Sequence, residues 1–382
     1  MRAPISTTSQ ERLVTAPDIP HAEPRLGTVA VLYTKPETVI SDYADLMDLA
    51  GYQDSLTPDI PTLLKVNISW QHYYPACSTA PWQIEGVANK LRADGFDNLT
   101  AAHNGTVVVD PIEGRVKNKH AAVEDRLNIP HIILDTPEME WVRYKPEAKM
   151  LVLNDIYKDG IYIPEMLLGT NIIQLPTVKT HVFTQMTGAM KNAFGGLLHR
   201  YRHWTHAQIH ETLVDLLQIQ REIHSGLFAV MDGTFAGDGP GPRAMRIHTK
   251  NIILASADQV AIDAVAAKLM GFDPMSIPKI RIAHEMGLGI GNPNEIQLKG
   301  DDIVNVKWNF SPDENTFASR GQKLIYWGPL KPLEGMLLRS PITPWAFVAS
   351  NLYHNEFWLR LIGRKRVADA LKTPWGKLFK NY

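Results

Sequence analysis

The chain has 382 residues and a single cysteine, Cys77. One cysteine cannot build a disulfide framework, and it cannot supply the ligands of a zinc ribbon or of a cysteine-ligated iron–sulfur cluster. We therefore expect no cysteine-ligated iron–sulfur cluster. A metal bound to this chain would be held by His, Asp or Glu side chains or by a cofactor.

The sequence also lacks an excess of one charge and long apolar runs. Its 39 Lys and Arg balance 40 Asp and Glu, so no global field attracts a polyanion, and we expect no nucleic-acid partner. No segment approaches the ~18 uncharged apolar residues of a transmembrane helix, and the N-terminus lacks the apolar core of a secretory signal. These absences predict a cytoplasmic protein.

What the sequence does contain is an alternation of short apolar runs with longer helical patterns. This alternation predicts an α/β fold with mainly parallel sheets flanked by helices. We expect strands within residues 27–33, 62–70, 98–105, 131–137, 171–178, 227–233 and 251–257. We expect helices within residues 41–52, 81–96, 120–129, 205–222, 258–270 and 277–286.

Length and composition divide the chain into three parts. Residues 1–25, rich in Pro, Ser, Thr and charge, predict a flexible N-terminal arm. Residues 26–330 are long for one core, so we expect two lobes, roughly 26–145 and 146–330, with a cleft between them. Residues 331–382 predict a basic helical C-terminal extension. Its segment 340–382 either docks a partner or a membrane surface or packs back onto the core.

Polar residues follow four of the expected strands. They are Lys65 and Asn67, His103, Lys179 and His181, and Asp232. Ligands bind in open parallel sheets at the carboxyl ends of the strands, so these side chains predict a cleft that binds a small anion. For each single residue, a local capping role is the competing interpretation.

Two glycine-containing segments add candidates for anion binding. In "TGAMKNAFGG", Thr187 or Gly188 opens a helix whose free N–H groups can bind an anion, and Lys191 follows one turn later. Lys191 then acts as a point charge, as a desolvated nucleophile or base, or as a surface lysine. In "MDGTFAGDGPGPR", Arg243 either clamps an anion or ends a plain flexible connection.

The histidines after this segment raise the question of a metal. His206 and His210 are spaced i, i+4, which on one helix places both on the inward side and allows joint coordination of a divalent metal. The glutamate of zinc-protease motifs is absent, and buried structural or pH-sensitive histidines are the competing interpretation.

Several motifs together resemble the family called domain of unknown function 362. They are "KVN" at 65–67, "PTVKTHVFTQMTGAMKNAFGGL" at 176–197, "ETLVDL" at 211–216, "VMDG" at 230–233 and "ILASADQVAIDAVAAKLMGFDP" at 253–274. The resemblance covers about residues 28–300 and implies a fold more than an activity. Some relatives carry ferredoxin modules, whose cysteines are missing here.

The order of several residues is also similar to that in nickel-pincer lactate racemases. In those enzymes, the lysine that corresponds to Lys191 tethers a nickel-pincer nucleotide, and two histidines are the catalytic acid and base. The resemblance therefore implies a shared fold and a site at Lys191, with His103 and His181 in the positions of the acid and base. It implies a nickel ligand among His203, His206 and His210.

This sequence departs from those enzymes in one respect. Their lysine follows a double glycine, whereas Lys191 follows Gly188, Ala189 and Met190.

Together these observations predict an enzyme that acts on a small anionic substrate, either an isomerase of the racemase or epimerase kind or an oxidoreductase. His103, His181 and Lys191 are the expected catalytic residues. The expected substrate-binding residues are Lys65, Asn67, Lys179, Asp232 and Arg243. The competing hypothesis is a non-catalytic accessory protein that binds a ligand or metal and docks a partner or membrane surface.

Overall fold

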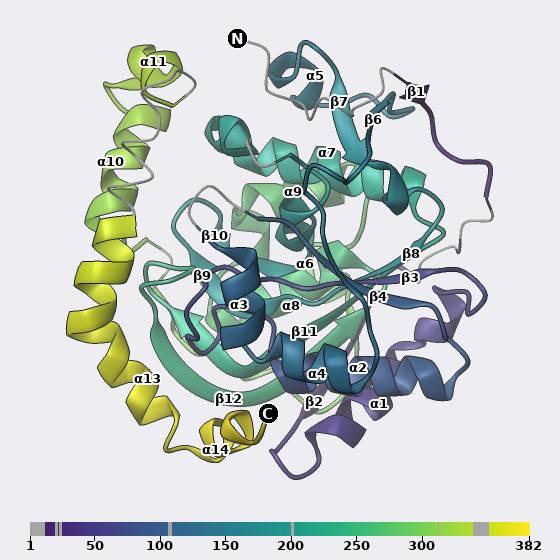
Figure 1. Cartoon of the computed structure of the whole chain (residues 1–382), viewed down its shortest axis with the longest axis vertical. Coiled ribbons are helices and arrows are strands. Elements are labelled where there is room, and N and C mark those ends of the chain that lie inside the picture. The colour runs from purple at the N-terminus through teal and green to yellow at the C-terminus, as the bar shows by residue number, and fades with distance from the viewer. Residues whose placement is uncertain are drawn as a thin grey trace.

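The computed structural model describes residues 12–19, 22, 25–105, 109–199, 202–311, 313–338 and 351–382. Within them, a large sheet runs in the order β13-β2-β12-β11-β8-β3-β4-β5, with the short strands β9 and β10 beside β11. Figure 1 shows helices on both faces of this sheet, which is the α/β architecture expected from the alternation of apolar runs.

The strands of the large sheet are mainly parallel. β11 pairs in parallel with β8, β8 with β3, β3 with β4 and β4 with β5, whereas β12 is antiparallel to both its neighbours. The bounds are β2 Thr28–Tyr33, β3 Thr62–Lys65, β4 Leu99–His103, β5 His131–Ile133, β8 Asn171–Gln174, β9 Thr177–His181, β10 Gln185–Met186, β11 Gly226–Asp238, β12 Arg246–Ser256 and β13 Gln297–Gly300.

The expected division into lobes 26–145 and 146–330 is not how the chain is built. Strand β2 from the first range lies between β12 and β13 from the second, and β8 lies between β3 and β11. The hydrogen-bonded ladders therefore join both ranges in one continuous sheet. The prediction was based on length, and length cannot reveal strands that are exchanged between halves.

Alternate residues of the strands supply two apolar cores, as expected for a sheet covered on both faces. Ile253 and Ala255 of β12 belong to the core beneath α1, α2 and the C-terminal helices, whereas Ile252 and Leu254 belong to the core beneath α6, α8 and α9. The bounds are α1 Val39–Ala50, α2 Pro81–Ala93, α3 Pro111–Lys117, α4 His120–Arg126, α5 Leu153–Ile156, α6 Gly188–Asn192, α7 Ile209–Ile223, α8 Gln259–Met270 and α9 Pro278–Glu285.

A second sheet of three short strands lies apart from the main one. Its order is β1-β6-β7, with β1 Leu13–Val14, β6 Trp141–Tyr144 and β7 Ile161–Pro164. Strand β1 falls in the segment expected to be a flexible arm, but it pairs in parallel with β6. The rest of that arm, residues 1–11, 20, 21, 23 and 24, lies outside the described residues.

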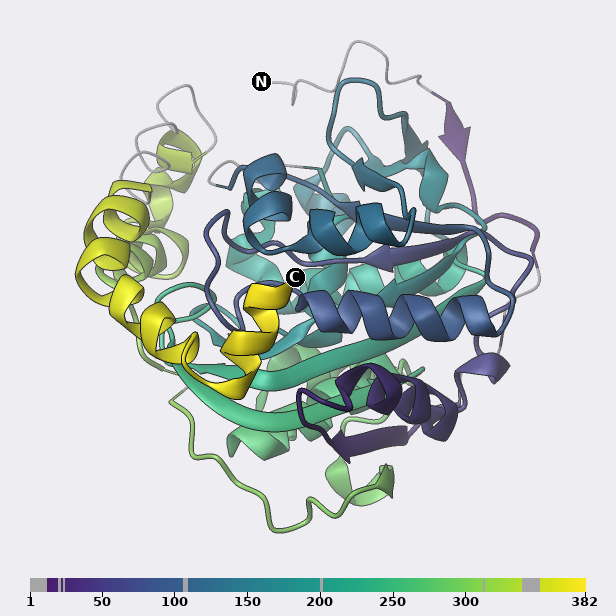
Figure 2. The ribbon, with the colours of Figure 1, turned by 60° about the horizontal axis from the view of Figure 1, so that its bottom comes forward.

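The C-terminal segment is helical, as expected, and packs on the core. Its elements are α10 Phe317–Tyr326, α11 Glu334–Leu338, the π-helical segment η8 Leu352–Gly363, α13 Arg364–Ala370 and α14 Pro374–Asn381. Trp358, Trp375 and Phe379 are buried in the core that covers α1 and α2. Figures 1 and 2 show these helices along one side of the molecule, ending beside α2.

Residues 339–350, which include part of the expected docking segment 340–382, lie outside the described residues. Among the residues that are described, no helix has the length and apolar character needed to cross a membrane. The single cysteine, Cys77, is fully buried, and burial raises the pKa of its thiol to about 11.

Candidate functional site

A cavity of about 280 Å³ lies at the carboxyl ends of β3, β4 and β9. It brings together seven of the ten residues singled out from the sequence, which are Lys65, Asn67, His103, His181, Lys191, His206 and Arg243. Lys65 and His103 end the adjacent parallel strands β3 and β4, where Lys65 pairs in register with Ala102. Parallel pairing therefore delivers both side chains to the same edge of the sheet.

Lys65 is buried in a space that the Gly195–Gly196 pair leaves open. Its side chain is 2% exposed, and its Nζ donates to the carbonyl oxygen of Val66 at 2.5 Å. A Cβ at Gly196 would lie 2.6 Å from Lys65 Cε, so a larger residue there would displace the lysine. Asn192 closes the arrangement by donating to the Lys65 carbonyl oxygen at 2.8 Å. Burial is the main reason that the pKa of Lys65 falls to about 7, and Arg202 lowers it further.

Two histidines of the cavity differ in whether Nε2 carries the proton of the neutral ring. The Nδ1 atom of His181 accepts the backbone N–H of Phe183 at 3.1 Å, so the neutral ring carries its proton on Nε2. The Nδ1 atom of His206 lies 3.0 Å from the carbonyl oxygen of His203, which requires the proton on Nδ1 and leaves the Nε2 lone pair free. His181 is thus a donor and His206 an acceptor at Nε2.

Burial keeps these rings neutral. It lowers the pKa of His181 well below its ordinary value, with Lys191 as the next cause, and it lowers the pKa of His206 to about 3. His103, at the deep end of β4, has a pKa well below its ordinary value for the same reason, with Lys65 as the next cause. Neither ring nitrogen of His103 has a hydrogen-bond partner within the described part of the chain.

The cations of the cavity contact neutral groups. Lys191 Nζ lies 5.0 Å from the centroid of the Phe194 ring, and the Arg202 guanidinium lies 5.5 Å from the same centroid. Arg243 Nε donates to the carbonyl oxygen of Ser69 at 3.1 Å. Burial, followed by the charge of Arg202, lowers the pKa of Lys191 to about 7. The described lining residues include no aspartate or glutamate.

Lys179 and Asp232 do not line this cavity. Lys179 lies behind it, on a smaller cavity of about 60 Å³ that Lys191 and His181 also line, and its Nζ donates to the hydroxyl of Thr177. Asp232 lies inside β11, where its carboxylate accepts from Tyr43 Oη at 2.7 Å and Trp82 Nε1 at 2.9 Å. The expectation of substrate contact for Asp232 therefore differs from the structure. Its carboxylate fastens α1 and α2 to the sheet.

The glycine-containing segment 231–243 is shorter as a loop than expected. Residues up to Asp238 continue β11, with a bulge between Gly233 and Phe235, so only the part from Pro240 to Arg243 reaches the cavity. Gly237 is required within the strand because a Cβ there would lie 2.4 Å from Met245 Sδ. Close packing, rather than turn formation, accounts for this glycine.

His206 and His210 do not converge on a common point. A 3₁₀ segment, η4 Arg202–Gln208, ends where α7 begins, and Gln208 has non-helical backbone angles. The i, i+4 alignment assumed one continuous α-helix, and this break removes it. His210 instead accepts the backbone N–H of Lys279 at 3.2 Å. No cluster of three or more His, Cys, Asp or Glu able to hold a metal is present in the described residues.

The helix N-terminus at Gly188 is already occupied by an anion of the chain itself. Asp263 Oδ1 accepts the backbone N–H of Ala189 at 2.5 Å, and Asp263 Oδ2 lies 2.8 Å from Lys279 Nζ. Gly188 has φ +84°, and a Cβ there would lie 2.2 Å from the Asp263 carboxylate. The expectation of a ligand-binding N-terminus at Thr187 or Gly188 is therefore corrected. The local sequence around Gly188 does not predict this contact, because Asp263 lies 74 residues after Ala189 in the chain.

The cavity also contains residues that were not selected from the sequence. Asn192 comes from α6, Arg202 from η4, Tyr326 from α10 and His354 from η8. His203, one of the three candidates for a nickel ligand, lines the cavity as well. In the sequence, Arg202 could have been found from its position next to the histidines of the same segment. No local pattern marks Tyr326 or His354, because they belong to helices that return from the C-terminal end of the chain.

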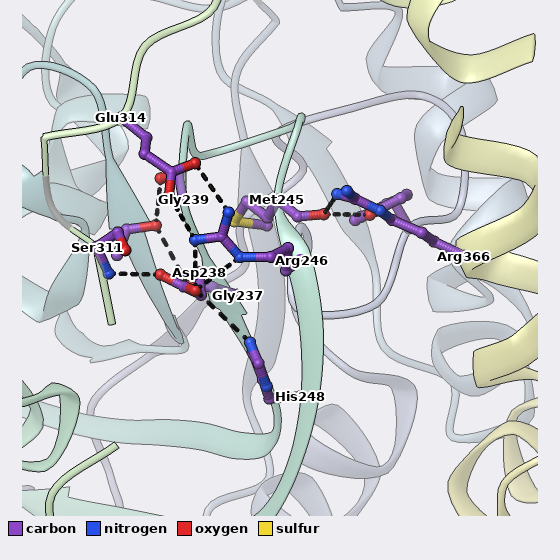
Figure 3. Close-up of polar contacts among 11 residues, drawn as sticks. Gly237, Asp238, Gly239, Met245, Arg246, His248, Ser311, Glu314 and Arg366 are labelled. Atoms are coloured by element: carbon purple, nitrogen blue, oxygen red, sulfur yellow. Dashed lines mark hydrogen bonds and ion pairs between the residues drawn. The ribbon is translucent and has the colours of Figure 1, made fainter. Parts of the chain in front are cut away.

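An ionic cluster fixes the start of α10 beside the cavity (Figure 3). Arg246 of β12 lies 2.7 Å from Asp238 and donates to both carboxylate oxygens of Glu314 at 2.8 Å. Asp238 also accepts the backbone N–H of Ser311 at 2.7 Å. The cluster holds Ser311 and Glu314 against the β11–β12 hairpin. It thereby places Thr316 and Ser319, which line the cavity.

The nickel-pincer resemblance can be compared with this geometry. Lys191, His181 and His206 all line the cavity, and His210 does not. A volume of about 280 Å³ lies at the lower end of the range for a single small-molecule ligand, and a nucleotide together with a substrate needs more room. We therefore derive no step through such a cofactor.

Comparison with solved structures gave no match. Among characterised proteins, the chain is similar to a thylakoid-associated protein from the cyanobacterium Synechocystis sp., with 27% identity over 130 residues. That alignment covers 33% of this chain and 40% of the relative, so it spans less than half of either protein.

The broader comparison is with protein families. Residues 62–268, which run from β3 into α8, match the family described as a domain of unknown function, DUF362. The matched region contains the strand ends, α6 and η4, and therefore nearly all of the cavity apart from α10 and η8. The chain belongs to the DUF362 family.

Proposed function

We propose that the protein is an enzyme that transfers a proton to or from a small anionic substrate bound in this cavity. The observation that carries the proposal is the pair His181 and His206, whose Nε2 atoms are a donor and an acceptor on the walls of one cation-lined cavity. General acid–base catalysis needs such a complementary pair within reach of one substrate.

The cations give the site its substrate class. Lys65 and Lys191 bind the anionic group, and Arg243 and Asn67 add donors at the rim. A bound carboxylate places the neighbouring C–H within the cavity. His206 Nε2 then accepts the proton, and the electron pair of the C–H bond moves onto the carboxylate, which the lysines stabilise as an enediolate. His181 then gives its Nε2 proton to the opposite face of that carbon. Exchange with solvent restores the proton on His181 and removes the one on His206, which completes a racemase- or epimerase-like exchange.

Burial makes this proton transfer dependent on the substrate. In the empty cavity the cations disfavour a charged imidazole, and the pKa of His206 is about 3. A bound anion supplies opposite charge and raises the pKa of His103, His181 and His206. The histidines therefore become effective bases only when an anion neutralises the lysines. This coupling restricts the chemistry to anionic substrates.

The test is deuterium exchange at carbon. The protein is incubated in heavy water with a panel of small hydroxy acids, dicarboxylates and phosphorylated acids, and proton NMR follows loss of C–H signals. We expect exchange with at least one member, abolished in His181→Gln and His206→Gln. His284→Gln, a histidine on α9 outside the cavity lining, is the matched control.

Folding of each variant is checked by its Tm. Substrate conversion without deuterium incorporation would replace proton transfer with hydride transfer, the oxidoreductase alternative. Exchange that persists in both histidine variants would refute the acid–base assignment. Intact-mass measurement of the purified protein tests whether a cofactor is covalently attached to Lys191. A mass adduct on Lys191 would mean that the mechanism includes such a cofactor.

A second candidate function is association with an anionic membrane surface through the C-terminal helices. The described face of η8 exposes Leu352, Phe357, Leu361 and Ile362, and exposed Arg360, Arg364 and Lys365 lie among and after them. Apolar and basic side chains together are typical of helices that lie in a membrane interface. The thylakoid association named for the Synechocystis relative supports this candidate.

Vesicle flotation tests the membrane candidate. Phe357→Glu, at a side chain that is 61% exposed, should abolish binding to vesicles that contain anionic lipid. Val304→Glu, at an equally exposed apolar residue far from η8 in the chain, should leave it unchanged. Equal binding by both variants would exclude η8 as the contact surface.

A further inference from the structure

The cations of the cavity form no ion pair with any residue that the structure describes. Lys65, Lys191, Arg202 and Arg243 line it, and every partner recorded for them above is a carbonyl oxygen or an aromatic ring. Arg202 also donates to the carbonyl oxygen of Gly105 at 3.3 Å. Among the residues that the structure describes, none of the four forms an ion pair with a carboxylate.

This pattern differs from that of Lys279, another buried cation in the same chain. Lys279 has no exposed side-chain surface, yet its Nζ lies 2.8 Å from the Asp263 carboxylate. Burial of Lys65 and Arg202 without an anionic partner is costly, and the four cations around one cavity repel each other as well. A single negative charge on a ligand could pair with only part of this cluster. A ligand with several negative charges offsets more of the repulsion.

We propose that the substrate of this site carries at least two negative charges, and that its binding draws protons from solvent into the cavity. The inference rests on the proposed anion-binding function and narrows its substrate class. A volume of about 280 Å³ limits the substrate to a compact molecule, such as a short dicarboxylate or a small phosphorylated acid.

The proton uptake follows from the state of the lysines. Lys65 and Lys191 have pKa values of about 7, so each is close to half protonated in the empty cavity at neutral pH. In the described part of the chain, the charged groups that act on the pKa of these two lysines are positive, and the histidines beside them are neutral. Around Lys65 these are His103 and Arg202, with Asp135 beyond Arg202.

Around Lys191 the facing groups come from three elements. These are Arg202 and His206 of η4, His181 and Lys179 of β9, and Lys279 of α9, whose charge Asp263 balances. None of the groups next to Lys191 releases a proton when an anion arrives, because the histidines are already neutral. A bound dianion therefore raises the pKa of both lysines, and the two half-empty sites together take up about one proton.

Isothermal titration calorimetry at pH 7 tests both parts. The probes are malonate, inorganic phosphate and, as the monoanion control, acetate. Each is titrated in two buffers that differ in ionisation enthalpy. We expect malonate or phosphate to bind at least about tenfold more tightly than acetate, with a buffer-dependent heat equal to uptake of about one proton.

The outcomes separate this inference from the proposed function. Equal affinity for acetate and malonate would overturn the requirement for two charges, and a heat that is independent of buffer would overturn the proton uptake. In both cases anion binding itself would survive. Failure of all three probes to bind would instead count against the proposed function and, with it, this inference.

A lysine variant checks the source of the proton. Lys65→Arg keeps a positive charge at the end of β3, but arginine stays protonated at neutral pH. Uptake should then fall to about half of the wild-type value, while the preference for malonate over acetate persists. Lys158→Met, at a lysine that is 73% exposed, is the matched control and should change neither quantity. Unchanged uptake in Lys65→Arg would exclude Lys65 as the acceptor.

Discussion

Two buried lysines in this chain have opposite surroundings. Lys279 forms an ion pair with Asp263 and also donates to the carbonyl oxygen of Thr187, so its charge is neutralised within the protein. Lys65 is almost as buried, at 2% exposure, but its ammonium group contacts only a carbonyl oxygen. Lys279 therefore stabilises the fold through its ion pair, whereas the charge of Lys65 remains available to bind a ligand.

The largest expected effect comes from breaking the Asp263–Lys279 pair. Asp263→Ala leaves Lys279 charged and unpartnered and also removes the acceptor for the N–H of Ala189. We expect the free energy of unfolding to fall by about 3–5 kcal/mol. Urea denaturation measures it.

A double variant provides the control for that loss. Asp263→Leu combined with Lys279→Met removes both charges and keeps apolar volume, so most of the stability should return. If Asp263→Ala lowers the free energy of unfolding by less than about 1 kcal/mol, the Asp263–Lys279 ion pair does not stabilise the fold as this comparison requires.

The second prediction concerns Lys65. Lys65→Met removes a cation that has no counter-ion, so the free energy of unfolding at neutral pH should stay within about 1 kcal/mol of the wild type or rise. Affinity for malonate should fall at least about tenfold, since a charge-assisted contact is lost. Calorimetry and urea denaturation of the same preparation measure the two quantities. A large loss of stability with unchanged affinity would reverse the assignment of the two lysines.

The third prediction is a dependence of stability on pH. The pKa of Lys65 is lowered from 10.5 to about 7 in the folded protein. Between these values the unfolded chain binds a proton that the folded chain has released, so the free energy of unfolding rises with pH. The raised pKa of Cys77 acts in the opposite direction near and above its ordinary value of 9.0, which limits the test to about pH 7–8.5.

The slope of the free energy of unfolding against pH tests whether Lys65 is the residue responsible. Lys65→Met should reduce it by up to about 1.4 kcal/mol per pH unit, the contribution of one proton. Denaturation curves at several pH values within this range measure the slope for both proteins. Identical slopes would mean that Lys65 keeps its proton in the folded state.

The smallest effect is expected at the partly exposed cluster of Figure 3. The side chains of Arg246 and Glu314 are 39% and 42% exposed, so solvent weakens their interaction. Arg246→Ala should lower the free energy of unfolding by only about 0.5–1 kcal/mol, and less at high salt. Thermal unfolding at two salt concentrations checks this, and a loss as large as that of Asp263→Ala would place the cluster among the buried pairs.

The pKa of Glu314 gives the same cluster a pH signature. Arg246 lowers that pKa, so the contribution of Glu314 is present above the ordinary glutamate value and is lost as pH falls through the lowered one. Acidification through this lowered pKa should therefore weaken the attachment of α10. Hydrogen exchange in α10 between pH 5 and lower values, compared with Glu314→Gln, follows this step.

The sequence predicted well those features that depend on local patterns. Apolar runs located β2, β3, β4, β8 and β12, and the parallel arrangement placed the ends of β3, β4 and β9 at one edge. That is why Lys65, His103 and His181 were selected together. The family was also predicted from its motifs, and the match over residues 62–268 confirmed it.

The failures have a common physical cause. Asp232 and Gly188 are positioned by partners more than 70 residues away in the chain. Tyr43 and Trp82 donate hydrogen bonds to the Asp232 carboxylate, and the Asp263 carboxylate binds the helix N-terminus at Gly188. No local sequence pattern predicts these contacts. His210 was misplaced because a 3₁₀ segment changes the residue period just before α7. The cavity wall formed by α10 and η8 depends on chain return, which single-sequence periodicity does not contain.

The isolated thiol of Cys77 has a practical consequence. It is fully buried and its pKa is about 11, so thiol-directed reagents react with it slowly at neutral pH. The natural chain is therefore already a suitable background for attaching a spectroscopic label at an engineered cysteine. One label at exposed Lys377 of α14 and a second at exposed Arg320 of α10 would measure the distance between these two helices. A change in that distance on adding an anion would show that the C-terminal helices move when the cavity is filled.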